Sequence, residues 1–447
     1  MQTDIRRRSL LLGGISAPLA LRASPYSSAE WSNWSGSVRS APRWRLYPRS
    51  TAELQAATAV APGPLRPLGA GQSWAPLAAT EGTQIDLRGL YGLVGWNESL
   101  SRVRVRAGTR LADLSALLEA RGSMLPVLGH SLDMTLAGAL ATGSYGGLFG
   151  ASTLSSQVTA LQLLTPGGEI LEVSEREHPE WLPALACSLG ALGILTEVEL
   201  QLRPSTRLRD SVQRLGLSEA LGQLQSAQKQ VEQCSLLVFP YSDVAYLRQL
   251  RPTASSPTEV AQTELPWREW MTQLGHQVPP LDAPLQSLYS LLQWSEERVV
   301  EPQQLHSPWQ RMRYQALEYV LPAAEATECL LSLRSAIRQA ELNLMLPLEL
   351  NALEADAAWI SPCYRRPAVA IALRQWVGAD AAPLFALAEP ILRRFGGRPH
   401  WASAHSMGAA ELAQLYPRWE DFQSLRAELD PLGRMLSPAL RQLLLPA

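Results

Sequence analysis

The hydrophobic and polar positions of the first half of the chain follow two periods, which predicts a mixture of helices and strands. Residues 102–106 read Arg-Val-Arg-Val-Arg, the period-two pattern of a half-buried strand. Residues 109–121 instead repeat apolar positions at helical spacing and stop at Gly122. Further strands are expected at 84–87, at 158–164 and 169–173 as a hairpin, and within 189–202, with an N-capped helix at 50–60.

The single helices among the short strands of the first half favour an α+β fold over a doubly wound sheet. The second half differs in composition. A stretch rich in Pro, Gln, Ser and Trp, residues 253–302, predicts a long loop or helical excursion. The change in composition after Arg203 predicts a second domain from about residue 206. In that domain we expect strands at 312–320 and 368–376, with a helix at 323–340.

Composition narrows the classes of function. The 447 residues carry a net charge of −2, so no basic field is present to attract nucleic acid. The cysteines lack a CxxC spacing and the histidines lack an HxxH pair, which argues against a metal site. Isolated buried thiols are expected, although disulfides stay an alternative. The four cysteines are Cys187, Cys234, Cys329 and Cys363.

The N-terminus has the order of an export signal. Arg6, Arg7 and Arg8 precede a modest apolar run that is too short to span a bilayer. Paired arginines followed by Ser and small apolar residues resemble a twin-arginine signal, with a small-x-small cleavage site before Glu30. Residues 1–29 are therefore expected to direct export to the periplasm or an equivalent compartment. The alternative is a disordered basic tail. No other segment is long and apolar enough to be an integral membrane segment.

Two glycine-dense loops carry the clearest chemical signal. Residues 66–76 contain Gly69, Gly71 and Ser73, and residues 138–147 contain a Thr-Gly-Ser-Tyr-Gly-Gly run. Glycine beside Ser or Thr lets backbone N–H groups and hydroxyls approach an anion closely. Two such loops, each at the end of an apolar segment, suggest a cradle for a large phosphorylated cofactor.

With these motifs in order, the chain resembles the FAD-linked oxidoreductases of the vanillyl-alcohol oxidase type, in the aldonolactone and alditol oxidase branch. The first loop is similar to the family's Gly-x-Gly-His-Ser loop over the FAD pyrophosphate. The C-terminal part resembles that branch's terminal segment. The matching stretches are 68–76, 107–114, 135–146, 188–198, 396–401, 415–422 and 429–434.

The resemblance implies a two-subdomain FAD-binding domain of the PCMH type at 30–205. It also implies an α+β substrate (cap) domain at 206–447, whose C-terminal segment returns to the flavin. The cofactor would be FAD. The residues that the resemblance implies for binding it are Gly69, Ala70, Gly71, Gln72, Ser73, Pro76, His130, Gly138, Thr142, Gly143, Ser144, Tyr145, Gly146, Gly193 and Ile194.

The departures from the family concern the flavin first. Many members carry FAD covalently on the histidine of the first loop, where this chain has Gln72. An amide cannot form that linkage, so we expect non-covalent FAD. Tyr145 stands where the branch has histidine, and His130 stands where an acidic residue is common. His130 either pairs with a backbone carbonyl or, less in keeping with the pattern, attaches the flavin.

The catalytic positions depart as well. The family's Glu-x-Arg element is Glu349-Leu-Asn351 here, and its His-Trp-Gly-Lys run is His400-Trp-Ala-Ser403. Asn351 and Ser403 thus offer hydrogen bonds but no cation to stabilise negative charge. Losing a cationic neighbour would raise the pKa of Glu349 if that residue is buried. The four catalytic candidates are Glu349, Asn351, His400 and Ser403.

The resemblance implies oxidation of a hydroxyl-bearing carbon of a polyol, sugar or aldonolactone, by hydride transfer to FAD. The electron acceptor would be oxygen or a quinone. One alternative is a dehydrogenase that passes electrons to a quinone or carrier protein. The other is a flavin-binding protein that has lost this activity.

Overall fold

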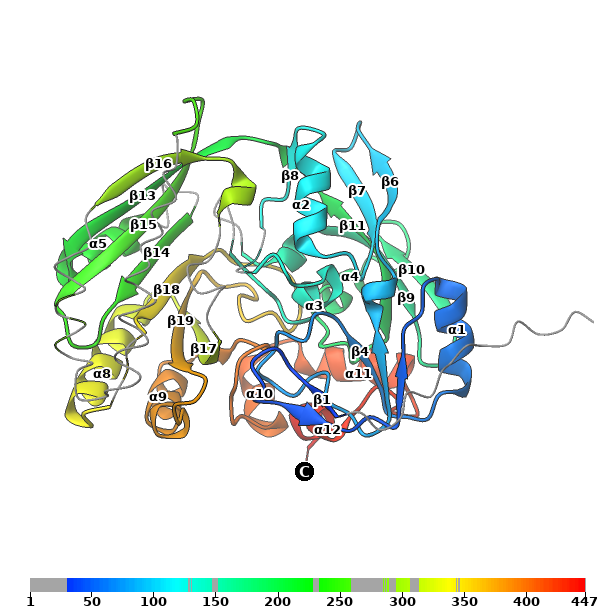
Figure 1. The fold of residues 1–447 in the computed structure, drawn as a ribbon. Helices are drawn as coiled ribbons and strands as arrows, with labels where there is room; N and C mark the ends of the chain where they lie inside the picture. The colour runs from blue at the N-terminus through cyan, green and yellow to red at the C-terminus, as the bar shows by residue number, and fades with distance from the viewer. Residues whose placement is uncertain are drawn as a thin grey trace, which may run out of the picture.

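The structure is a computed structural model that describes residues 30–127, 129, 131–146, 152–227, 233–258, 284, 286, 288, 295–305, 313–342, 344 and 346–446. Two large antiparallel sheets dominate it, and helices pack around them (Figure 1). This confirms the α+β class. The export segment 1–29 lies outside the described residues.

The first glycine loop follows a strand of a small parallel sheet. Its strands run in the order β3 (Trp44–Leu46), β5 (Thr83–Asp86), β4 (Leu65–Leu68). Helix α1 (Thr51–Val60) connects β3 to β4, and the Ser50 hydroxyl caps it by accepting from the N–H of Glu53. The cap is where the sequence predicts it. Because β4 is buried and paired to β5, the sheet holds the start of the loop at residues 69–73 in place.

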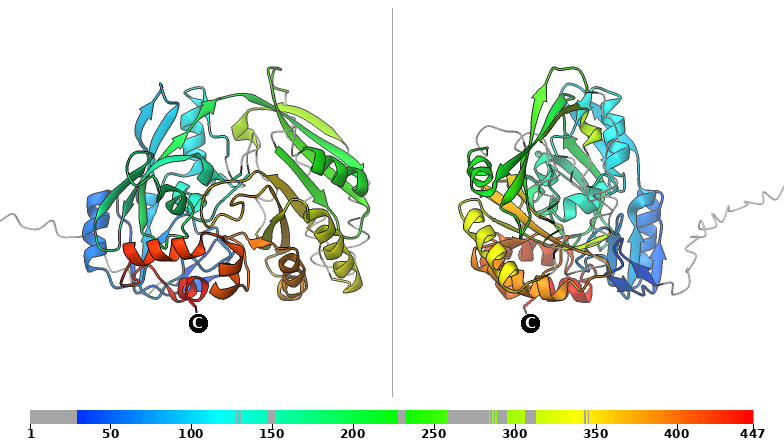
Figure 2. Two further views of the ribbon diagram at one scale, coloured as in Figure 1. Left: turned by 180° about the vertical axis from the view of Figure 1, so that it is seen from behind. Right: turned by 60° about the vertical axis from the view of Figure 1, so that its left-hand side comes forward.

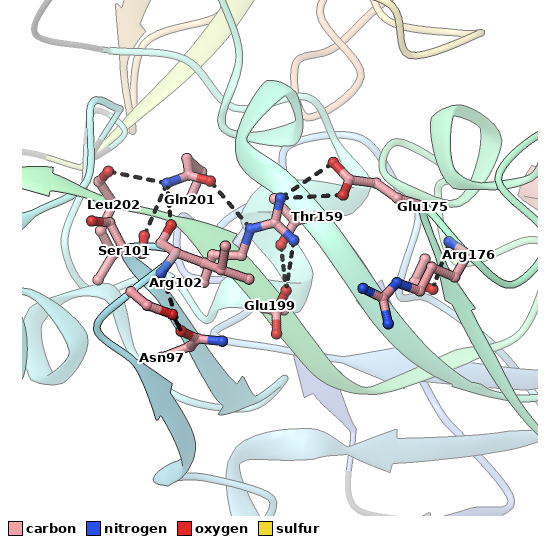
Figure 3. Close-up of polar contacts among 12 residues, drawn as sticks. Asn97, Ser101, Arg102, Thr159, Glu175, Arg176, Glu199, Gln201 and Leu202 are labelled. Carbon is pink, nitrogen blue, oxygen red and sulfur yellow. Dashed lines mark hydrogen bonds and ion pairs between the residues drawn. The ribbon is translucent and has the colours of Figure 1, made fainter.

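The second sheet has five strands, and one of its faces carries several ion pairs. On β7 the two valines, Val103 and Val105, are fully buried, whereas Arg102 faces outward. Arg102 lies 3.2 Å from Glu175 and 3.5 Å from Glu199 (Figure 3). The alternation predicted at 102–106 is confirmed. The strand order is β10 (Ile170–Ser174), β9 (Val158–Leu164), β11 (Ile194–Gln201), β7 (Arg102–Arg106), β6 (Leu93–Asn97).

The eight-stranded sheet fills the second half of the chain. Helices α5 (Leu217–Ala227), α8 (Ala326–Gln339) and α9 (Ala382–Arg394) pack on the side away from the first sheets (Figure 2). The strand order is β16 (Glu296–Val300), β13 (Arg207–Gly216), β15 (Val244–Thr253), β14 (Gln233–Val238), β18 (Leu348–Leu353), β19 (Ala368–Trp376), β17 (Tyr314–Pro322), β20 (Arg398–Pro399).

The C-terminal helices return to the start of the chain. Helices α10 (Ala409–Leu415), α11 (Trp419–Leu429) and α12 (Pro438–Leu444), red in Figure 1, lie beside the blue N-terminal segment. The N–H of Leu65 donates to the carbonyl of Arg434 at 2.7 Å. The last segment therefore packs against the strand that leads into the first glycine loop. The domain boundary near residue 206 stays a prediction.

Two predicted elements differ from the structure. The region 253–302 is not a loop throughout, because residues 296–300 form β16, which pairs with β13. The helix expected from residue 323 starts at Ala326, after a turn closed by the N–H of Glu325 on the carbonyl of Pro322. The remaining elements are β1 (Trp31–Ser32), β2 (Arg39–Ser40), β8 (Ser123–Met124), β12 (Arg203–Pro204), α2 (Leu111–Glu119), α3 (Leu136–Ala141) and α4 (Leu182–Leu185).

All four cysteines are buried free thiols, as expected. Within the described ranges, no group of three or more His, Cys, Asp or Glu side chains is arranged to hold a metal ion. The helices in the same ranges are too short or too polar to span a bilayer.

Candidate functional site

A cavity lies where the two glycine loops meet the eight-stranded sheet. One wall is the loop that follows β4, including Gly69 and Gln72. A second wall comes from α3 and the turn after it, including Gly138 and Tyr145. Strands β17 and β19 close the far end with Glu318 and Arg374. Segments more than 300 residues apart in the sequence thus share one lining.

The first glycine loop can approach the start of α3 closely because residue 69 has no side chain. A Cβ on Gly69 would lie 2.1 Å from the Thr135 hydroxyl oxygen, which is a clash. Gly71 has a φ of +69°, a conformation that favours glycine. Among the described residues, no group accepts a hydrogen bond from the backbone N–H groups of residues 69–73.

The second loop is built around similar restrictions. The Thr135 hydroxyl accepts from the N–H of Gly138, which caps α3. Gly143 has a φ of +65°. Outside this loop, Gly193 directly precedes β11 and also lines the cavity; it has a φ of +147°, and a Cβ there would lie 2.8 Å from the Leu164 carbonyl oxygen. These contacts explain why glycine occupies the turns.

The donor set of this cradle fits FAD. Five consecutive backbone N–H groups lack partners in the described chain, and Gly71 lets the loop curve around an anion. The anionic part of FAD is its diphosphate, which such donors would hold. Gln72 lies in the lining and offers an amide, with no imidazole for a covalent bond.

The far end of the cavity holds a buried row of charges. Glu349 on β18 and Glu318 on β17 both stand opposite Ala372 of β19. Arg374 lies two residues further along β19, so its side chain shares their face of the sheet. Its Nη2 is 2.7 Å from a carboxylate oxygen of Glu349. Burial disfavours the charged guanidinium of Arg374. The nearby Glu349 and Tyr314 outweigh this effect, so the pKa of Arg374 is raised.

This row corrects one sequence-based expectation. The chain does lack the family's arginine at Asn351, but the site does not lack a cation. Arg374 supplies one from the neighbouring strand, and it pairs with Glu349. Asn351 donates to the other carboxylate oxygen of Glu349 at 3.2 Å. The sequence pattern missed this because adjacency across strands depends on the register of β18 and β19.

Tyr145, Glu318 and His400 form a second buried group. The Tyr145 hydroxyl donates to Glu318 at 2.5 Å. Burial first, and then the charge of Glu318, raise the pKa of Tyr145 well above its usual value, so the hydroxyl stays protonated. The His400 Nδ1 is 3.9 Å from Glu318, and its ring meets that of Tyr145 edge-on. Neither ring nitrogen of His400 has a hydrogen-bond partner in the described chain.

The turn that carries His400 is tied to the first glycine loop. The carbonyl of Ala402 accepts from the N–H groups of Trp74 and Ala75 and from the hydroxyl of Ser73. The N–H of Ser403 donates to the carbonyl of His400. These bonds bring the C-terminal segment to the cofactor loop.

Three aromatic rings form one wall of the cavity. Trp34, Trp74 and Tyr314 all line it, with ring centroids 5.1–6.5 Å apart. Trp74 Nε1 donates to the carbonyl of Tyr314 at 2.6 Å. The Arg374 guanidinium lies 5.5 Å from the centre of the Tyr314 ring. The aromatic wall therefore adjoins the buried charges of Arg374 and Glu349.

The sequence-predicted residues divide by position. Pro76 is exposed, Glu349, Asn351 and Ser403 are buried behind the lining, and Gly143, Gly146 and Ile194 also lie outside it. His130 lies outside the described residues. The role of each of these residues stays a prediction. Those in the lining are Gly69, Ala70, Gly71, Gln72, Ser73, Gly138, Thr142, Ser144, Tyr145, Gly193 and His400.

The sequence reasoning overlooked Glu318, Arg374, Trp34 and Tyr314. A signal existed for the first two. Glu318 stands alone in the apolar run 316–321, and Arg374 is the first charge after the apolar residues 368–373. A single charge in an otherwise buried strand is a candidate site residue, because burying it without a partner is costly.

Comparisons with known proteins agree with this geometry. A model of the D-arabinono-1,4-lactone oxidase family matches residues 198–443, and an FAD-binding-domain model matches residues 42–174. The chain is 30% identical over 427 residues to L-gulono-1,4-lactone dehydrogenase of Mycobacterium tuberculosis, covering 93% of this chain and 99% of that protein.

Two further enzymes match over nearly their whole length. L-gulonolactone oxidase of Bos taurus is 27% identical, with coverage of 93% and 98%. Alditol oxidase of a Streptomyces strain is 27% identical, with coverage of 92% and 98%. The crystal structure of cholesterol oxidase from B. sterolicum shares the fold at 15% identity, with a TM-score of 0.76 and coverage of 93% and 96%.

Proposed function

Because the chain belongs to the D-arabinono-1,4-lactone oxidase family of FAD-dependent oxidoreductases that act on CH–OH groups, we propose that its substrate is an aldono-1,4-lactone. The single observation that carries the choice of a lactone over an open-chain polyol is Arg374. A lactone has a ring carbonyl oxygen, a hydrogen-bond acceptor that an open-chain polyol lacks. A buried guanidinium in the cavity lining can donate to that oxygen and orient the ring.

The remaining residues suit removal of a hydroxyl proton. Bound FAD supplies a hydride acceptor. The hydroxyl oxygen must then release its proton, and His400 has two ring nitrogens that accept no hydrogen bond from the described chain. Glu318, 3.9 Å from Nδ1, would stabilise the imidazolium that forms. The Tyr145 hydroxyl holds Glu318 in place.

Anaerobic bleaching of the flavin tests the substrate class. We expect aldono-1,4-lactones to bleach the holoenzyme's flavin absorbance, and open alditols of the same carbon number to do so at least about tenfold more slowly. Faster bleaching by alditols would reject the lactone assignment. Bleaching by no compound of either class would favour the alternative of a flavoprotein without this activity.

A histidine variant tests the proton acceptor. His400→Gln should slow bleaching by about 10²–10⁴-fold, the usual contribution of general base catalysis. His405 provides the matched control: it is half-buried, lies five residues away and outside the cavity lining, and desolvation lowers its pKa to about 4. His405→Gln should bleach at the wild-type rate. Equal effects of both substitutions would contradict the role of His400.

The electron acceptor divides oxidase from dehydrogenase. The relatives include enzymes named for both activities. Reoxidation of the bleached enzyme by oxygen, compared with a soluble quinone, separates the two. Rapid reoxidation by oxygen would support the oxidase, and selective reoxidation by the quinone would support the dehydrogenase.

Export stays part of the proposal. The basic cluster at residues 6–8 and the short apolar run after it support a twin-arginine signal, which carries folded, cofactor-loaded proteins. The full-length chain should appear in the periplasmic fraction with its N-terminus cleaved before Glu30. Replacement of Arg6, Arg7 and Arg8 by lysine should retain it in the cytoplasm. Export that is unaffected by this change would reject the twin-arginine route.

A further inference from the structure

Arg66 is a buried cation that the proposed chemistry does not use. It lies on β4, directly before the first glycine loop, and is 2% exposed. Its guanidinium donates to four backbone carbonyls at 2.7–3.0 Å. These belong to Leu77, Leu189, Gly190 and Met435, so Arg66 joins β4 to three other segments.

No carboxylate of the described residues lies within ion-pair distance of Arg66. The buried Arg374 and the half-buried Arg248 differ, because each pairs with a carboxylate at 2.7 Å. Burial lowers the pKa of Arg66 to about 9, so the guanidinium is still charged at neutral pH. Arg66 also contributes to the cavity lining. The cavity therefore has an uncompensated positive charge beside its glycine loops.

The carbonyls held by Arg66 also decide where two N–H groups point. In a trans peptide the C=O and N–H point in opposite directions. When the Leu77 and Leu189 carbonyls turn toward Arg66, the N–H groups of Ala78 and Gly190 turn away from it. Ala78 and Gly190 both line the cavity. Neither of these two N–H groups donates a hydrogen bond to another group of the described chain.

We propose that Arg66 is the positioning residue for the diphosphate of FAD. Its charge attracts the only anionic part of the cofactor, and its four hydrogen bonds hold the turns around residues 77 and 189 so that their N–H groups remain available. This inference rests on FAD binding and is independent of the choice of lactone as substrate.

The test compares FAD with riboflavin, which has the same ring system but no phosphate. Apoprotein of the full chain is titrated with each ligand, and the change in flavin fluorescence gives Kd. Arg66→Gln should raise the Kd for FAD at least about tenfold and leave the Kd for riboflavin unchanged. Arg66→Lys keeps the charge but cannot make the four hydrogen bonds, so it should bind FAD more tightly than Arg66→Gln and more weakly than wild type.

Arg398 is the matched control. It is buried, bonds the carbonyls of Leu415, Pro362 and Tyr364, and lies outside the cavity lining. Arg398→Gln therefore removes a similar arginine without touching the cofactor, and its Kd for FAD should equal the wild-type value. Melting temperatures of the apoproteins report any general loss of stability in both variants.

Three results would overturn the proposal. Arg66→Gln could leave the Kd for FAD unchanged, or raise the Kd values for FAD and riboflavin equally, or Arg66→Lys could be as weak as Arg66→Gln. If Arg66→Gln does not fold, wild-type protein decides: added salt should weaken FAD binding and leave riboflavin binding unaffected. Equal salt sensitivity for both ligands would also reject the role of Arg66.

Discussion

The guanidinium of Arg374 lies 2.7 Å from the carboxylate of Glu349, across two adjacent strands of the eight-stranded sheet. A cation that the family pattern would place at residue 351 thus stands on the next strand. The ion pair keeps Arg374 charged in a buried site, and Asn351 completes the contacts of Glu349. The chain thus keeps the family's carboxylate as Glu349, whereas its cation is Arg374 on the neighbouring strand.

Removing that cation should impair the reaction, and it also leaves the buried Glu349 without its ion-pair partner. We expect Arg374→Gln to lower kcat/KM for the lactone about 10- to 100-fold, as loss of a charge-assisted contact of about 1.5–3 kcal/mol does. Steady-state kinetics with an artificial acceptor measures this. The double variant Asn351→Arg/Arg374→Gln should recover part of the loss. No loss in the single variant would show that Arg374 does not contact the substrate.

Tyr145 should act through Glu318. Tyr145→Phe removes the hydroxyl that donates to this carboxylate at 2.5 Å and keeps the ring that packs against His400. We expect kcat to fall about 10-fold or more, while Kd for FAD stays at the wild-type value. Stopped-flow reduction and flavin titration check the two quantities. A larger effect on FAD binding than on kcat would place Tyr145 in cofactor binding instead.

The flavin should be dissociable. Gln72 lies in the lining where many relatives have a histidine bonded to the flavin, and an amide cannot form that bond. Acid precipitation of the wild-type holoenzyme should therefore leave the yellow colour in the supernatant. Colour that remains in the pellet would show that another residue attaches the flavin.

Asp210 should make stability depend on acidic pH. It is buried and accepts hydrogen bonds from Arg248 and Arg298 on the two adjacent strands. Burial opposes the charged carboxylate, but the two arginines outweigh it and lower the pKa of Asp210. Because the pKa of Asp210 is lower in the folded than in the unfolded chain, its carboxylate stabilises the fold at pH values above the usual aspartate pKa near 4. This stabilisation is lost as the pH falls through the lowered pKa.

Asp210→Asn should therefore cost about 1.5–3 kcal/mol at pH 7, because it removes the charged acceptor of hydrogen bonds from two half-buried arginines. The loss should shrink below pH 4. Urea unfolding at several pH values measures it. Glu172→Gln, which breaks an ion pair of Glu172 with Arg104 on the outer face of the five-stranded sheet, should cost less than about 1 kcal/mol. A similar cost for both variants at pH 7 would contradict the structural assignment.

Local pattern was enough for most of the elements. The alternation at residues 102–106 and the cap at Ser50 depend on neighbouring residues only, so both are where the sequence predicts them. Strand β16 was missed, because it is a short segment whose pairing with β13 supplies the reason for its extended form. Likewise, the start of α8 depends on a turn bond between Glu325 and Pro322 that no helical periodicity reports.

The sequence by itself determined the cofactor site. Backbone N–H groups form this site, so the two glycine-dense loops together were enough to suggest it, and the resemblance names the cofactor as FAD. Only the tertiary structure decided where the charges of the cavity lie. Arg374, Glu349 and Glu318 meet because β17, β19 and β18 pair in one register, and a register is a property of the folded sheet rather than of any one strand.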